Sequence, residues 1–143
     1  MKYWLFFSVK VTTFLIFLAS VFQSSLVLAA PKSDLQNQTI QGNTGGSIKS
    51  DNCGFIAATP IHTISLSQRI DYLRMLVQAD GGQPTLLVVG PKAEDSFCVL
   101  GDLSAGLNPE ISGVWEPGTY QVYVGDRSGE RHQFSLSIFT DKN

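Results

Sequence analysis

Residues 91–110, PKAEDSFCVLGDLSAGLNPE, contain several acidic side chains, and carboxylates are the side chains that bind calcium. A calcium ion takes about six to eight oxygen ligands, several of them from carboxylates. The carboxylates here are sparse: Glu94, Asp95, Asp102 and Glu110, with the Asn108 amide as a neutral ligand. We therefore expect solvated loop carboxylates and no cofactor. A calcium site on Asp95 and Asp102 remains the alternative.

The stretch VWEPGTYQVYVGD, residues 114–126, places three aromatic residues, Trp115, Tyr120 and Tyr123, around a Pro-Gly corner. If Trp115 and Tyr123 are both exposed, their rings form a platform on which a sugar stacks. If the corner is structural, Pro117 presets φ, Gly118 supplies a positive φ, and the Trp115 ring caps the end of a β-sandwich. We expect the structural joint and keep the stacking platform as the alternative.

Residues suited to catalysis are few and scattered. The run GDRSGE at 125–130 holds the Gly, Asp and Ser of a serine-protease nucleophile motif, but Arg127 interrupts it. His62 lies on an alternating strand face and His132 beside a Gly-rich hairpin, so neither has a visible catalytic partner. A carboxylate pair for glycoside hydrolysis is not excluded by spacing alone. We predict that the chain has no catalytic residues and is not an enzyme.

The chain contains two cysteines, Cys53 and Cys98. An even count in an exported chain favours one disulfide, which would stabilise the domain by roughly 4 kcal/mol in the chain-entropy description. Two buried free thiols or a metal pair are the alternatives, although neither histidine has a zinc-like spacing from a cysteine.

Residues 1–29 have the order of a secretory signal: Lys2 and Lys10, an apolar core, and the small-residue exit LVLAA. We expect cleavage after Ala29, and hence a secreted or periplasmic protein. A retained anchor is the alternative, although the apolar core is shorter than the roughly 20 residues of a spanning helix. Beyond Ala29, eight basic and twelve acidic residues give a net charge of −4, which disfavours nucleic acid or an anionic membrane surface as a partner.

The rest of the chain divides into a polar leader and a β domain. Residues 30–50 are rich in Gln, Asn, Thr, Ser and Gly, and we predict a flexible leader there. From residue 51 to 143 the apolar residues alternate with polar ones, and turn residues separate the runs. This pattern predicts an antiparallel β-sandwich that starts near Cys53, with strands near 62–66, 72–79, 85–90, 119–124 and 133–139.

The run Pro117 to Gly125 (PGTYQVYVG), together with TLLVVGP at 85–91 and FSLSI at 134–138, resembles the bacterial pre-peptidase C-terminal domain family. The closest likeness is to short, secreted, stand-alone forms of that family. The resemblance implies a jelly-roll-like sandwich without catalytic activity, which aids secretion, folding or attachment to a substrate. Some members bind calcium through acidic loops. This chain keeps Asp102 and Asn108 but lacks the dense acidic cluster of those forms.

Three functions remain on these grounds. The first is a module that binds an extracellular or periplasmic glycan or protein through loop residues at one end of the sandwich. Its candidate ligand-binding residues are Trp115, Tyr123, Asp102 and Asn108. The second is a structural or secretion-assisting domain with no small ligand. The third, which we do not favour, is a small extracellular hydrolase.

Overall fold

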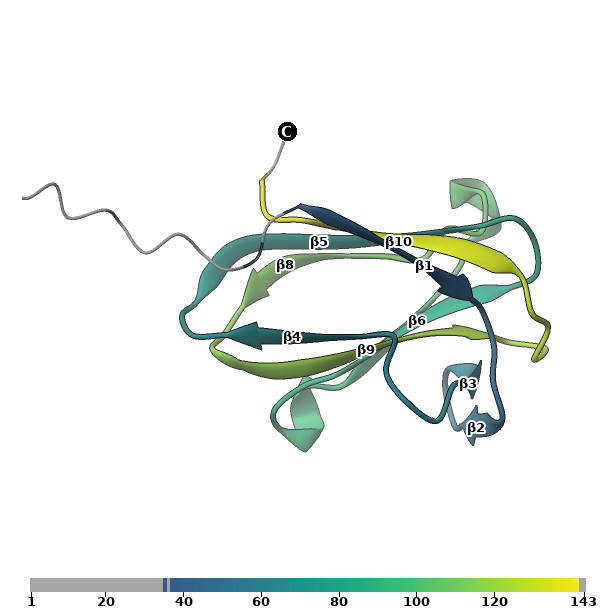
Figure 1. Cartoon of the computed structure of the whole chain (residues 1–143), viewed down its shortest axis with the longest axis horizontal. Coiled ribbons are helices and arrows are strands. Elements are labelled where there is room, and N and C mark those ends of the chain that lie inside the picture. The colour runs from purple at the N-terminus through teal and green to yellow at the C-terminus, as the bar shows by residue number, and fades with distance from the viewer. Residues whose placement is uncertain (1–34, 36, 142–143) are drawn as a thin grey trace, which may run out of the picture. The chain divides into compact units, whose positions relative to one another are not determined.

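The computed structural model describes residue 35 and residues 37–141, which form two antiparallel sheets packed face to face (Figure 1). The predicted signal peptide lies outside the described residues. The four-stranded sheet has the order β1 (Gln38–Asn43), β10 (Gln133–Phe139), β5 (Ile70–Ala79) and β8 (Glu110–Trp115). The other sheet has the order β2 (Ile48–Ser50), β3 (Gly54–Ile56), β9 (Gly118–Asp126), β6 (Pro84–Val89) and β7 (Phe97–Leu100), and β4 (His62–Leu66) also pairs with β9. Two short 3-10 helices, η1 (Ala93–Asp95) and η2 (Leu103–Ala105), flank β7.

The predicted β-sandwich is confirmed, and the alternating runs form its core. Two predicted strands, 62–66 and 133–139, coincide with β4 and β10, and β5, β6 and β9 lie within two residues of their predicted bounds. Leu73, Met75 and Val77 on β5 are fully buried because alternate side chains of a strand point to one face. They pack in one cluster with the inward residues of β6, β9 and β10.

The flexible leader predicted over residues 30–50 is wrong for its second half. Residues 38–43 form β1, which pairs with β10 along all six of its residues. Polar residues suffice in this edge strand because β10 supplies the backbone hydrogen bonds, and Ile40 packs against the core. The predicted start of the domain near Cys53 is therefore too late, and the sandwich begins at Gln38.

Four other strands were not predicted: β2, β3, β7 and β8. Two of them, β2 and β3, have three residues each, too few for an alternating pattern to appear in the sequence. In β8, Gly113 interrupts the apolar face between Ile111 and Trp115. Each of these strands is fixed by its neighbour rather than by its own pattern.

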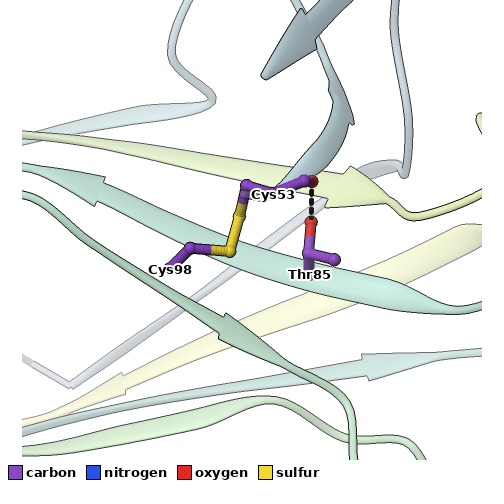
Figure 2. Close-up of a disulfide and its surroundings, with 3 residues drawn as sticks. All are labelled: Cys53, Thr85 and Cys98. Atoms are coloured by element: carbon purple, nitrogen blue, oxygen red, sulfur yellow. Dashed lines mark hydrogen bonds between the residues drawn. A yellow bond between two sulfur atoms is a disulfide. The ribbon is translucent and has the colours of Figure 1, made fainter. Parts of the chain in front are cut away.

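A disulfide between Cys53 and Cys98 joins the β2–β3 hairpin to β7, as predicted (Figure 2). The Cα atoms of the two cysteines are 5.7 Å apart. Beside the bond, the buried Thr85 hydroxyl donates to the Cys53 carbonyl at 2.8 Å. β3 pairs with β9 only at Phe55 and Asp126. The disulfide and the Thr85 hydrogen bond therefore provide much of the attachment of the hairpin to its sheet.

The Pro-Gly corner is a structural joint. The Trp115 ring is 5% exposed and meets Tyr120 edge-to-face, with 4.9 Å between ring centroids. A second edge-to-face contact joins Trp115 to Phe97 at 5.7 Å. The Tyr120 hydroxyl donates to the Glu116 carbonyl at 3.0 Å, which closes the corner. The three rings thus seal one end of the core.

Replacing Trp115 with Ala should lower the free energy of unfolding by about 3–5 kcal/mol, because it removes a buried ring from a packed cluster. Urea denaturation followed by circular dichroism measures the change. Val114→Ala, at a neighbouring side chain that is 53% exposed, is the control and should cost little. A Trp115→Ala protein as stable as the parent would show that the ring is not part of the core.

Candidate functional site

Four loops meet at the end of the sandwich opposite the Trp115 corner, on the right in Figure 1. They connect β1 to β2, β5 to β6, β7 to β8 and β9 to β10. Three of them border a groove of about 760 Å³, whose lining residues are Gly82, Gln83, Gly101, Asp102, Leu103, Leu107, Arg127, Ser128 and Glu130. This loop-end groove mixes charged, polar and apolar side chains.

Asp126, the last residue of β9, holds the loops of the groove in place. It is fully buried, and its carboxylate accepts four hydrogen bonds. The Gln83 backbone N–H donates to Oδ2 at 2.7 Å, which ties the β5–β6 turn to β9. The Ser128 N–H and hydroxyl, each at 2.8 Å, and the Glu130 N–H at 3.1 Å donate to Oδ1. One carboxylate therefore fixes both turns.

The same contacts keep the carboxylate ionised. Burial raises the pKa of Asp126, but the hydrogen bonds from Gln83, Ser128 and Glu130 lower it further than burial raises it. The net pKa lies below the ordinary value of 3.8. A buried charge with this many donors is stable only in one arrangement of the surrounding backbone.

Thr44, also fully buried, secures the other side of the β9–β10 turn. Its hydroxyl accepts from the His132 N–H at 3.0 Å and donates to the Glu130 carbonyl at 3.2 Å. The Thr44 N–H in turn donates to the His132 carbonyl at 2.8 Å. The turn is thus held from both sides, which leaves Arg127 exposed at the groove.

Leu103 projects from the rim of the groove with 85% of its surface exposed. It stands on η2, where the Asp102 carboxylate accepts from the Ser104 N–H at 2.7 Å and caps the helix. The Leu107 N–H donates to the Asp102 carbonyl at 2.7 Å and closes the loop. Leu107 itself has a φ of 61°, an unfavourable conformation for a non-glycine residue, held here by that hydrogen bond. These hydrogen bonds define the turn on which Leu103 stands.

The predicted ligand-binding residues fall in different places. Asp102 lines the groove, and Asn108 directly follows its lining residue Leu107. Trp115 is 5% exposed and lies at the far end of the domain, so it does not form an exposed platform with Tyr123. Tyr123 lies on β9 in the other sheet, half-buried, with its hydroxyl donating to Gln121 Oε1 at 3.1 Å. The stacking platform of Trp115 and Tyr123 is therefore wrong.

The candidate calcium ligands are not brought together. Asp95 belongs to η1 and Asp102 precedes η2, so β7 separates them by roughly 20 Å. Glu110 is engaged with Arg74 by two hydrogen bonds of 2.8 Å, which lower the pKa of the Glu110 carboxyl. No cluster of three or more acidic, His or Cys side chains suited to a metal occurs in the described residues.

The histidines and the Ser128 hydroxyl have structural contacts. His62 Nε2 lies 3.0 Å from the Gln38 side-chain nitrogen, in a contact that bridges the two sheets, and burial lowers the pKa of His62 below 6.5. His132 lies 3.2 Å from Glu130 and 3.6 Å from Asp80. The Ser128 hydroxyl donates to Asp126 and does not reach either ring as a partner.

The sequence did not predict Leu103 and Arg127 as surface features of the groove, nor Asp126 as its support. The order Asp126, Arg127, Ser128, Gly129 is typical of a turn in which an Asp side chain accepts from the backbone two residues later. That signal predicts the turn. Nothing local predicts that Gln83, from another loop, also donates to this carboxylate.

Comparison with known proteins agrees with this architecture. No protein-family model matches the chain. The fold is that of a pre-peptidase C-terminal domain, because the chain matches the crystal structure of that domain from a Bacillus anthracis collagenase with a TM-score of 0.51. That match has 17% sequence identity and covers 71% of this chain and 88% of the other. The resemblance noted in the sequence is confirmed at the level of the fold.

The chain belongs to the same family as the uncharacterized protein Synpcc7942_2126 of Synechococcus elongatus. The two are 40% identical over 106 residues, which make up 71% of this chain and 75% of that protein. Among the described residues, no helix is long and apolar enough to cross a membrane.

Asp126→Asn should destabilise the domain by about 2–3 kcal/mol at pH 7, because an amide replaces an ionised acceptor of several hydrogen bonds. Since the pKa of Asp126 is lowered in the folded state, its contribution is fully present above 3.8 and is lost as the pH falls through the lower folded value. Urea melts from pH 7 downwards should give a constant difference between parent and variant to about pH 5, and a shrinking difference below it. A difference that stays constant down to pH 2 would contradict the depressed pKa.

Added calcium should leave the melting temperature nearly unchanged, because Asp95 and Asp102 lie beyond opposite ends of β7. A site loaded to a hundred times its dissociation constant would instead stabilise the protein by about 2.7 kcal/mol. Thermal melts with calcium and with a chelator measure the difference. A clear rise that Asp102→Asn abolishes would establish a calcium site.

Proposed function

We propose that this chain is a non-catalytic module of an exported protein and that it binds an extracellular or periplasmic protein through the loop-end groove. The observation that carries the proposal is the exposure of Leu103, 85%, on a capped turn beside Arg127. An isolated apolar side chain held in water on a capped turn has no role in the core of its own domain. It is suited to insertion into an apolar pocket of a partner.

The make-up of the groove favours a protein over a glycan. None of the nine lining residues is aromatic, so the groove has no ring on which a sugar could stack. Leu103 and Leu107 offer aliphatic contacts, and Arg127 offers a guanidinium. Arg together with a central apolar anchor is typical of protein–protein interfaces.

Export is supported by the disulfide and by the signal-like start of the sequence. Disulfides persist in oxidising compartments and are rare in the cytosol.

The absence of catalysis is supported by the isolation of His62, which contacts Gln38 rather than a nucleophile, and by the engagement of the Ser128 hydroxyl with Asp126. It is supported also by the fold neighbour, a C-terminal domain of a collagenase.

The test is a comparative pull-down with the chain lacking the predicted signal peptide. The immobilised parent, a groove variant (Leu103→Ser with Arg127→Ala) and a control variant (Ile48→Ser with Lys49→Ala) are exposed to extracellular and periplasmic proteins of the source cell. The control changes an exposed apolar residue and an exposed cation on β2, outside the groove. All three proteins should have similar stability, because surface substitutions usually change it by less than about 0.5 kcal/mol.

We expect the parent and the control to retain the same protein, and the groove variant to lose it by about tenfold or more. Equal retention by the groove variant would reject the groove as the binding site. Selective binding to a glycan array by the parent would replace the protein partner with a glycan. No specific capture by any variant would favour a purely structural domain.

A further inference from the structure

Strand β8 is an outer strand of the four-stranded sheet and leaves one of its edges unpaired in the described chain. On its paired side, the Pro109 carbonyl accepts from the Val77 N–H of β5 at 3.0 Å. Alternate residues of a strand direct their backbone groups to opposite sides. The N–H and C=O groups of Glu110, Ser112 and Val114 therefore face the free edge, ready to pair with another strand.

A hollow lies behind this edge, between the two sheets. Gly113 shares the inward face of β8 with Ile111 and Trp115, yet a Cβ placed on it would meet no atom within 4 Å. The surrounding hollow has a volume of about 430 Å³, and its apolar walls include Ile111, Phe97 and Trp115. Protein cores are close-packed, so an open space opposite an inward position marks a place where a side chain is missing.

The surface around the hollow is apolar, with an acidic rim. Val114 is 53% exposed and Phe97 36% exposed, although both belong to strands. Lys92, Glu94, Asp95 and Glu116 lie at the rim and together carry a net charge of −2. Glu94 and Asp95 form no ion pair within the described residues, and the Glu116 carboxylate has only a long, exposed ion pair of 3.5 Å with Arg69.

We propose that the free edge of β8 accepts an extended segment of a partner polypeptide as an added strand. A large apolar side chain of that segment, opposite Gly113, fills the hollow, in the way that an aromatic residue covers a glycine on a neighbouring strand. A basic residue at the end of the segment opposite Glu116 faces the acidic rim. Pro109 and Pro117 bound the strand, so the paired stretch spans the six residues of β8, about 20 Å.

A second copy of the same chain fits this edge poorly. Antiparallel pairing of β8 with itself, centred on Gly113, places one glycine against the other and leaves both hollows empty. The edge is therefore complementary to a foreign segment with an apolar centre and a basic residue at the end opposite Glu116. This mode of recognition is main-chain pairing with side-chain pockets for specificity.

The probe is a capped peptide of sequence Lys-Val-Thr-Phe-Thr-Val-Lys, added to the isotope-labelled chain lacking the predicted signal peptide. Amide chemical shifts should change at Glu110, Ser112 and Val114, and a titration gives the dissociation constant. Replacing Phe by Gly in the peptide, or both Lys by Glu, should each weaken binding by about tenfold.

Gly113→Val fills the hollow from within and should weaken binding of the Phe peptide by about tenfold, without lowering the melting temperature. The matched control is Gln41→Val on β1, the opposite edge of the same sheet, which should bind the peptide like the parent. The groove variant of Leu103 and Arg127 should also bind it normally, which separates this site from the loop-end groove.

Shift changes that spread equally to β1, equal affinity for the Phe and Gly peptides, or no saturable binding would each overturn the proposal. Unchanged binding by Gly113→Val would overturn the role of the hollow. The peptide comparison requires no variant, so it decides the question even if a substitution disturbs the fold.

Discussion

The ionised carboxylate of Asp126 is the constraint on which the loop end of the domain depends. It is fully buried, and all four of its hydrogen-bond donors belong to the two adjacent turns. Removing a donor would leave a buried charge partly unpaired, which costs several kcal/mol. The backbone comes close enough to donate only where a side chain is missing: a Cβ on Gly82, whose φ is +73°, would lie 2.5 Å from Asp126 Oδ2. The hydrogen bonds to the carboxylate therefore depend on glycine at position 82, and the two residues together shape the groove.

The two ends of the sandwich are held by different physical means. At one end, Trp115, Tyr120 and Phe97 stabilise the corner by burying ring surface against one another. At the other end, hydrogen bonds to Asp126 and Thr44 hold turns that bury little apolar surface. The disulfide strengthens this polar end, because Cys53 precedes the hairpin strand whose single register pair joins Phe55 to Asp126. Apolar packing therefore supports the core, and directional contacts position the groove.

The sequence predicted the strands whose two faces differ in chemistry, and also β6, which is apolar on both faces. β4, β5, β9 and β10 alternate, because one face packs in the core and the other meets solvent. β1 was mistaken for a flexible leader, since QTIQGN needs only Ile40 for packing and takes its order from β10. The site was harder to predict than the fold. Asp102 was named for its carboxylate, yet that group caps η2, and the exposure of Leu103 depends on the conformation of the whole loop.

The loop from Gly101 to Pro109 borders both the loop-end groove and the free edge of β8. The hydrogen bonds at its two ends determine how the two surfaces are connected. At its start, the Gly101 N–H donates to the Pro84 carbonyl at 3.1 Å; at its end, the Pro109 carbonyl accepts from Val77 at 3.0 Å. Between these points, Leu107 bonds back to Asp102 and isolates η2 as a closed turn. The turn that bears Leu103 is thus attached to β6, whereas the start of β8 is attached to β5. The two surfaces therefore have separate backbone attachments, although one loop joins them.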